Sequence, residues 1–208
     1  QISILNGSTG VQTSSTPVAT LPPTNASDPN TYPHACRGVY ASIGGHEHLY
    51  LLEFSGAGSL PTSGPFPFYD VDLTMGTFAT PIADTNLALR AIAIDSAQNV
   101  YVVDMSYSQA SVNAAIDKNR IAKLSLNATG VVSGPTLTFT NTDVASNEPC
   151  GATNKWPSGA AIATIGGNER LLVGHDLGIA VYDPAALGTK VQDLSLAGFG
   201  QLFAQISP

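Results

Sequence analysis

Charged residues are scarce in this sequence. Only 11% of its 208 residues are Asp, Glu, Lys or Arg, and 15 acidic against 8 basic residues give a formal net charge of −7 at pH 7. With so few cations the chain cannot neutralise a row of phosphates, so we expect neither nucleic acid nor an anionic membrane surface as a partner. Low charge combined with 43% hydrophobic residues also excludes a mainly disordered chain and a coiled coil.

Long apolar runs and cysteine clusters are lacking too. No run approaches the ~18 to 20 residues that span a bilayer, so no membrane span is expected. The two cysteines, Cys36 and Cys150, do not form a CxxC motif, which argues against zinc ligation by thiolates. We expect a disulfide between them, closing a loop of roughly a hundred residues. The alternative is two buried thiols that never meet.

Several features favour a secreted, extracellular or periplasmic protein. The sequence begins at Gln1 without a charged, apolar leader, as a mature secreted product would. Glycosylation sequons start at Asn6, Asn25 and Asn127, each in a turn-like context that could accommodate a glycan. A glycoprotein with one disulfide is therefore the expectation.

Segments with strand character recur along the chain between clusters of Gly, Pro, Asn, Asp and Ser, which predicts an all-β protein. The clearest segments are Val39–Ile43, His48–Phe54, Phe66–Leu73, Ala91–Asp95, Val100–Asp104, Arg120–Leu126, Thr136–Thr140, Ala160–Ile165, Arg170–Val173, Ile179–Tyr182 and Val191–Leu196. One short helix is expected at 108–116.

Some of these strands are apolar at successive positions, as in Leu49–Leu52 and Val100–Val103. A strand with one wet face should alternate, so these strands must be covered on both faces. Without helices to cover them, other sheets must do so, which leaves a sandwich or the stacked blades of a β-propeller.

Internal repetition favours the propeller. Residues 39–49 align without gaps on 161–171, and both read as strand, Gly-Gly turn, strand. A third hairpin at 91–104 has a polar turn instead. Hairpins spaced roughly 50 to 70 residues apart match the size of four-stranded blades.

The middle unit resembles the NHL repeat of β-propellers. Its segments IAID (92–95), NVYVVD (99–104) and NRIAKL (119–124) are similar to the family's apolar strand, "NVYVAD" and "NRIQKF". The resemblance covers about residues 90–126 and departs from the family pattern at Gln98, where the family has a turn glycine, and at an insertion, 105–118. It implies the propeller fold but no activity, because the family includes lyases, lactonase relatives and binding platforms.

We therefore predict a single propeller-like domain over 1–208. Three blade-like units are expected at 37–81, 89–140 and 157–196, with partial units at 1–22 and 199–208. An open arc would expose two apolar sheet faces, so three outcomes stay open: a four-bladed ring sealed by the two ends, a piece of a longer chain, or a protomer completed by a neighbour or by strand addition.

The most site-like cluster pairs two histidines with two aspartates. His46 and His48 are two apart on a predicted strand, so they share a face and could chelate a metal; the alternative is a solvated turn. Asp70 and Asp72 also share a face, and carboxylates near strand ends could hold calcium in a propeller channel. Their alternative role is to cap turns.

Further binding candidates lie in predicted loops and turns. Trp156 could contact a sugar or peptide or could anchor a loop, and His175 and Asp176 lie at a predicted turn between strands. No nucleophile elbow, S-x-x-K motif or phosphate loop is present in the sequence. We expect a secreted binding or assembly module with a protein partner or homo-oligomeric state. The alternatives are a metal-dependent enzyme of lactonase or lyase type and a glycan-binding lectin.

Overall fold

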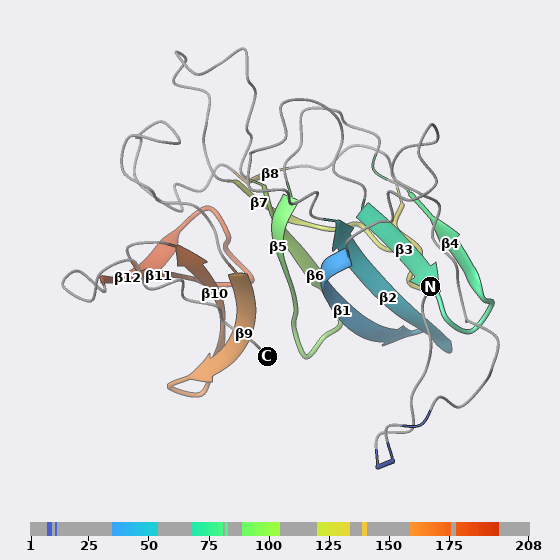
Figure 1. Ribbon diagram of the computed structural model, residues 1–208. Coiled ribbons are helices and arrows are strands. Elements are labelled where there is room, and N and C mark those ends of the chain that lie inside the picture. The colour runs from blue at the N-terminus through green and yellow to red at the C-terminus, as the bar shows by residue number, and fades with distance from the viewer. Residues whose placement is uncertain are drawn as a thin grey trace, which may run out of the picture.

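The computed structural model describes residues 8–9, 11, 35–53, 68–80, 82, 89–104, 120–133, 139–140, 159–175 and 178–195 (Figure 1). These residues form β-strands and turns and contain no helix. Accordingly, nowhere in this part of the chain does a helix occur that is long and apolar enough to cross a membrane. The helix expected at 108–116 and the partial unit expected at 199–208 lie outside the described residues.

The strands form three antiparallel sheets, in each of which consecutive strands are neighbours. The first sheet contains β1 (Ala35–Ile43), β2 (His46–Glu53), β3 (Phe68–Asp72) and β4 (Thr77–Ala79). The second sheet contains β5 (Leu89–Ile94), β6 (Val100–Asp104), β7 (Arg120–Lys123) and β8 (Phe139–Thr140). The third sheet contains β9 (Gly159–Ile165), β10 (Asn168–His175), β11 (Gly178–Tyr182) and β12 (Lys190–Ser195).

The predicted all-β class is confirmed, with three four-stranded sheets. The described residues do not close into a ring or barrel. Strand β4 was not predicted, because its three residues are all exposed and carry no apolar alternation.

The tight turns follow from glycine. Gly44 and Gly45 join β1 to β2, and Gly166 and Gly167 join β9 to β10, all with φ between 59° and 84°. Such left-handed φ values are easily adopted only by residues without a Cβ, and a pair of them makes a turn that matches the strand twist. These two glycine turns fix the pairing of β1 with β2 and of β9 with β10 from the hairpins outward.

The second sheet lies between the other two and is covered on both faces (Figure 1). All five residues of β6 are buried. Val100 and Val102 pack into one apolar core with Tyr50 and Phe68 of the first sheet. The alternate residues of β6, Tyr101 and Val103, belong to a second apolar core. In this core they pack with residues of the third sheet: Leu171, Val173 and Tyr182. The residues of Val100–Val103 are therefore apolar at successive positions because neighbouring sheets cover both faces of the strand, as the sequence predicted.

The three sheets are stacked the same way round. Their first strands adjoin, since β5 contacts both β1 and β9. Ala41 and Tyr50 point from the first sheet toward the second. Their counterparts in the aligned repeat, Ala163 and Leu172, alternate with the residues that face the second sheet and so point away from it. Each sheet therefore presents one kind of face to its predecessor and another to its successor.

Candidate functional site

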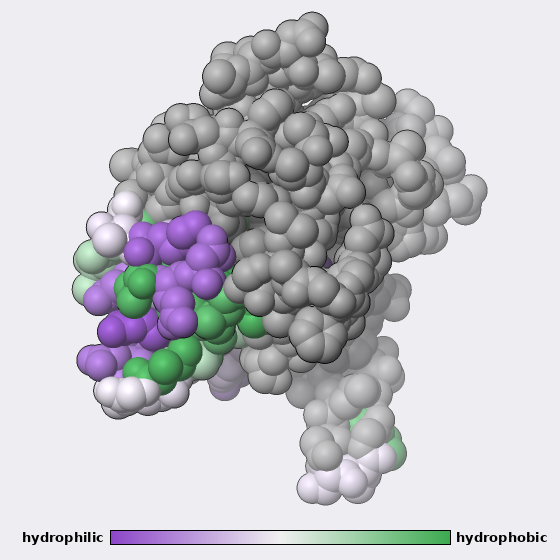
Figure 2. All heavy atoms as spheres, turned by 90° about the vertical axis from the view of Figure 1, so that its left-hand side faces the viewer, coloured by the Kyte–Doolittle hydropathy of each residue, from purple (hydrophilic) through white to green (hydrophobic). Residues whose placement is uncertain are grey.

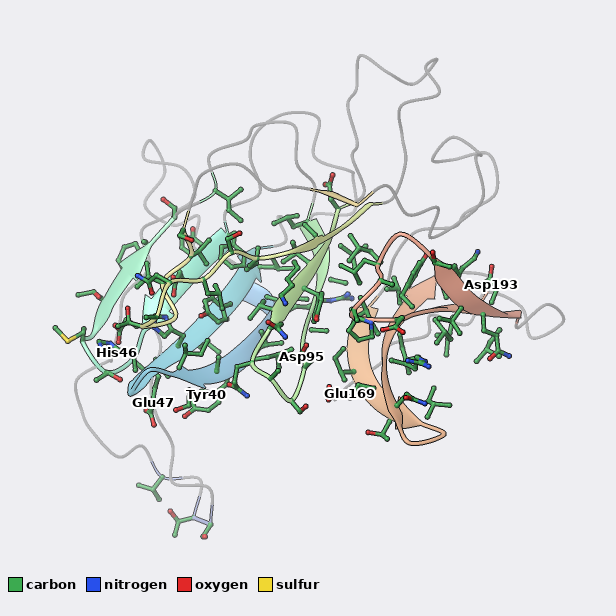
Figure 3. All side chains as sticks on the ribbon, turned by 180° about the vertical axis from the view of Figure 1, so that it is seen from behind. Tyr40, His46, Glu47, Asp95, Glu169 and Asp193 are labelled. Carbon is green, nitrogen blue, oxygen red and sulfur yellow. The ribbon has the colours of Figure 1, made fainter. Side chains whose placement is uncertain are left out.

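Two neighbouring strands of the first sheet bring together the four residues expected to bind metal. The register of β2 and β3 places His48 directly opposite Asp72. Because side chains alternate along a strand, His46 and Asp70 lie on the same face as this pair. We call these four residues, His46, His48, Asp70 and Asp72, the His–Asp array. It faces the second sheet, at the hairpin end of the first sheet, where Figure 3 shows His46.

Each histidine of the array contacts one aspartate. His48 Nδ1 lies 2.7 Å from Asp70 Oδ1, and both side chains are buried, with exposed fractions of 0% and 3%. His46 Nδ1 lies 2.9 Å from Asp72 Oδ2, at 29% and 12% exposure. One ligand atom from each of His46, His48 and Asp72 lies within 4.8 Å of the others. The array thus runs from a deep pair to a pair near the surface.

Three further polar atoms of the array contact backbone groups. His48 Nε2 lies 2.7 Å from the carbonyl oxygen of Thr129, and the Val132 N–H donates to Asp70 Oδ2 at 2.9 Å. The Met75 N–H donates to Asp72 Oδ1 at 2.9 Å. Three of the four side chains are therefore oriented from outside the array.

Two of these partners belong to residues 127–132, which lie between β7 and β8 and which we call the 127–132 loop. Tyr50 of the first sheet donates its hydroxyl hydrogen to the carbonyl of Gly130 in this loop. Since Tyr50, His48 and Asp70 all bond loop backbone, polar side chains of the first sheet satisfy backbone groups that burial would otherwise leave unpaired. The loop therefore fastens the first sheet to the second.

The loop is shaped by its own sequence. Asn127 Oδ1 accepts hydrogen bonds from the N–H groups of Thr129 and Val131, and from the Thr129 hydroxyl, each at 2.9 Å. Gly130 adopts φ 88°, and a Cβ there would lie 2.7 Å from His48 Cδ2. A Cβ on Gly44 would collide with the carbonyl oxygen of Ala128. The close approach of loop and array therefore depends on two glycines.

Burial and hydrogen bonding set the protonation of the neighbouring groups. Burial, and secondarily the Asp70 charge, raise the pKa of Tyr50 far above its usual value, so the hydroxyl keeps the hydrogen that it donates to Gly130. Partial burial raises the pKa of Asp72, but hydrogen bonds from Met75 and His46 and the charges of His48 and His46 together lower it below its ordinary value. Asp72 is a carboxylate in this setting.

The His48–Asp70 pair is not arranged as a catalytic base. A base must reach a proton on a substrate or nucleophile, but His48 is fully buried and its Nε2 faces a backbone carbonyl. A carbonyl oxygen can only accept, so it offers no proton to abstract. The array can hold a cation or serve as two ion pairs.

The structure separates the alternatives weighed from the sequence. The solvated-turn interpretation is wrong for His48, because the turn ends before β2 and His48 lies inside the strand, facing the 127–132 loop. The turn-capping interpretation is confirmed for Asp72, whose carboxylate accepts the Met75 N–H. Asp95 and Asp183 accept the N–H groups of Asn99 and Ala185 in the same way.

A polar hollow of about 380 Å³ lies between the second and third sheets. Its lining includes Asp95, Tyr101, Glu169 and Arg170. Asp95 already accepts from the Tyr101 hydroxyl at 2.7 Å, and Glu169 Oε1 accepts the Ser96 N–H at 3.1 Å. Figure 3 shows Asp95 and Glu169 near one another between the sheets. The hydrogen bond from Ser96 to Glu169 therefore links the second sheet to the third, as the 127–132 loop links the first to the second.

Other predicted residues are placed only in part. Asn127 is exposed in the 127–132 loop, His175 ends β10, and Cys36 lies in β1. The remaining candidates lie outside the described residues: Asn6, Asn25, Cys150, Trp156 and Asp176. The disulfide, the glycans and the binding role of Trp156 stay predictions.

Comparison of the chain with protein-family models, with curated proteins and with solved structures finds no match. Function must therefore be argued from the described residues alone.

Proposed function

We propose that this chain is a secreted binding or assembly module, built as an arc of an NHL-type β-propeller, that associates with a protein partner through an outer sheet face. A second copy of the chain is the partner we expect. The observation that carries the proposal is the uniform stacking of the sheets, in which every face that a neighbour covers contributes to an apolar core.

The back face of the third sheet is the face turned away from the second sheet. Direct strand pairing and alternation place five apolar side chains on it: Ala161, Leu172, Ile179, Val181 and Leu194. In the first sheet the equivalent face packs against a neighbouring sheet through residues such as Tyr50, the counterpart of Leu172. Repetition thus supports a further sheet as the natural occupant of this back face.

Part of the back face is accessible. Leu194 is 40% exposed and Ile165, at its rim, is 48% exposed. Leu172 and Ile179 are half-buried, while Val181 and Ala161 are buried. Figure 2, which views the molecule from the β12 side, shows apolar side chains among polar ones on the described part of the surface. Exposed apolar area with a polar surround is typical of a protein-binding surface.

Light scattering and native mass spectrometry of the full chain test the proposal. We expect wild type to form a dimer or larger assembly, and Leu194→Asp to weaken it by at least about tenfold in dissociation constant, the change that ~1.4 kcal/mol produces. Val131→Asp is the matched control, because Val131 is 37% exposed but lies in the 127–132 loop. A monodisperse 21.4 kDa wild type at all concentrations would contradict self-assembly.

A further inference from the structure

We propose that the His–Asp array binds one zinc-type divalent metal ion, with His46, His48, Asp70 and Asp72 as ligands, and that the ion fastens the 127–132 loop to the first sheet. This inference is independent of the assembly proposed above, because the array faces the junction between the first and second sheets and not the back face of the third.

The deep pair of the array has a position that either a proton or a metal ion can fill. The Thr129 carbonyl can only accept, so His48 Nε2 must carry a hydrogen to bond it at 2.7 Å. His48 Nδ1 in turn lies 2.7 Å from a carboxylate oxygen of Asp70. Two acceptors at that distance repel unless a proton or a metal ion lies between them. The space between Nδ1 and Asp70 is thus a cation position.

The backbone contacts are those of a metal site's outer shell. A metal-binding histidine usually donates its second ring N–H to a carbonyl or carboxylate, which fixes the ligand nitrogen toward the metal. His48 makes this contact with Thr129. Asp70 and Asp72 each use their second oxygen to accept a backbone N–H, from Val132 and Met75. One atom of each of these three side chains is left to face the others.

Ligand type and burial define the ion and its role. Two imidazole nitrogens and two carboxylate oxygens suit zinc, whereas calcium prefers oxygen ligands alone, so the calcium suggested by the aspartates is not the ion we propose. Zinc–ligand distances are about 2.0 to 2.2 Å. The ligand atoms of His46, His48 and Asp72 lie within 4.8 Å of one another and must move inward, which His46 can do at 29% exposure. His48 Nδ1 and Asp70 Oδ1, now 2.7 Å apart, must separate so that the ion replaces the proton between them. Four protein ligands with no open position form a structural site rather than a catalytic one.

Isothermal titration of the full, chelator-treated chain with ZnCl₂ tests the site. We expect one zinc per chain and a rise in melting temperature, because an ion that binds only the folded state stabilises it. Cobalt(II) bound in place of zinc should show the visible absorption of a tetrahedral site. His46→Ala should weaken zinc binding by about 10- to 100-fold or more, and its partly exposed position should leave the chain folded.

Glu47→Gln is the matched control. Glu47 lies between His46 and His48 on β2 but points to the opposite face, where it accepts a hydrogen bond from Tyr40 (Figure 3). This variant should bind zinc as wild type does. Absence of zinc binding by wild type, equal affinity in His46→Ala, or equal loss in Glu47→Gln would each overturn the site and leave two plain ion pairs. None of these results bears on the oligomeric state, which tests the proposed function separately.

Discussion

At the scale of single residues, Asp95 shows how one buried carboxylate organises a turn. Its two oxygens accept the Asn99 N–H at 2.8 Å, the Asn99 amide at 2.7 Å and the Tyr101 hydroxyl at 2.7 Å. Burial raises the pKa of Asp95, but the hydrogen bonds from Asn99 and Tyr101 outweigh it, so its pKa is lower than that of an ordinary aspartate. The folded state therefore favours the ionised form.

This lowered pKa predicts a defined pH dependence. Since the folded pKa lies below the unfolded value of about 4, the stabilisation by Asp95 is present above that pH and is lost as the pH falls through the folded pKa. We expect Asp95→Asn to be less stable than wild type at pH 7 by about 1 to 3 kcal/mol, and the difference to shrink below pH about 4. Urea midpoints from pH 7 to pH 3 measure it; a constant difference over this range would contradict the assignment.

Residue-scale detail also marks where sequence reasoning stops. Gln98 has φ 63° at the position where the NHL-like pattern carries glycine. The sequence shows that glutamine replaces the glycine of the pattern. It does not show the hydrogen bond that the side chain makes, in which Gln98 Oε1 accepts the Ser42 N–H at 3.0 Å. Because Ser42 lies 56 positions away and in another sheet, no local pattern could have paired them.

At the scale of elements, the sequence predicted strands where burial requires a recognisable pattern of apolar residues. Val100–Val103 could be identified as a strand covered on both faces because every residue is apolar. The sequence also placed His46 and His48 on one face. It could not show that His48 meets Asp70 or Thr129, since the register of β2 with β3 and the approach of the 127–132 loop are tertiary properties.

The 127–132 loop provides the element-scale prediction. Gly130→Ala would force a Cβ against His48 and Ile43, so we expect it to cost about 1 to 3 kcal/mol through overpacking, in addition to about 1 to 2 kcal/mol for a left-handed alanine. Gly167→Ala is the matched control, because Gly167 has φ 79° and nothing lies within 4 Å of its Cβ position. Denaturant unfolding compares the two. Equal losses would show that the loop does not press on His48.

At the scale of the whole molecule, stability should fall from the second sheet outward. Strand β6 is buried along its whole length and paired on both sides, whereas β4 is exposed throughout and β12 is an edge strand with 52% exposure at Val191. Hydrogen exchange opens the least supported elements first. We expect amide hydrogens of β6 to exchange roughly a hundredfold or more slowly than those of β4 and β12, a ratio that corresponds to about 3 kcal/mol.

The dependence of hydrogen exchange on protein concentration tests whether a second copy of the chain covers the back face of the third sheet. If a second copy covers the back face of the third sheet, raising the protein concentration should slow exchange in β11 and β12, because Ile179 and Leu194 lie on that face. Strand β6, already covered by both neighbours, should not change. Exchange followed by mass spectrometry at two concentrations, with Leu194→Asp alongside, measures the effect. Slowing of β12 that persists in the variant would place the partner on another surface, and no slowing in wild type would mean that the back face stays unpartnered.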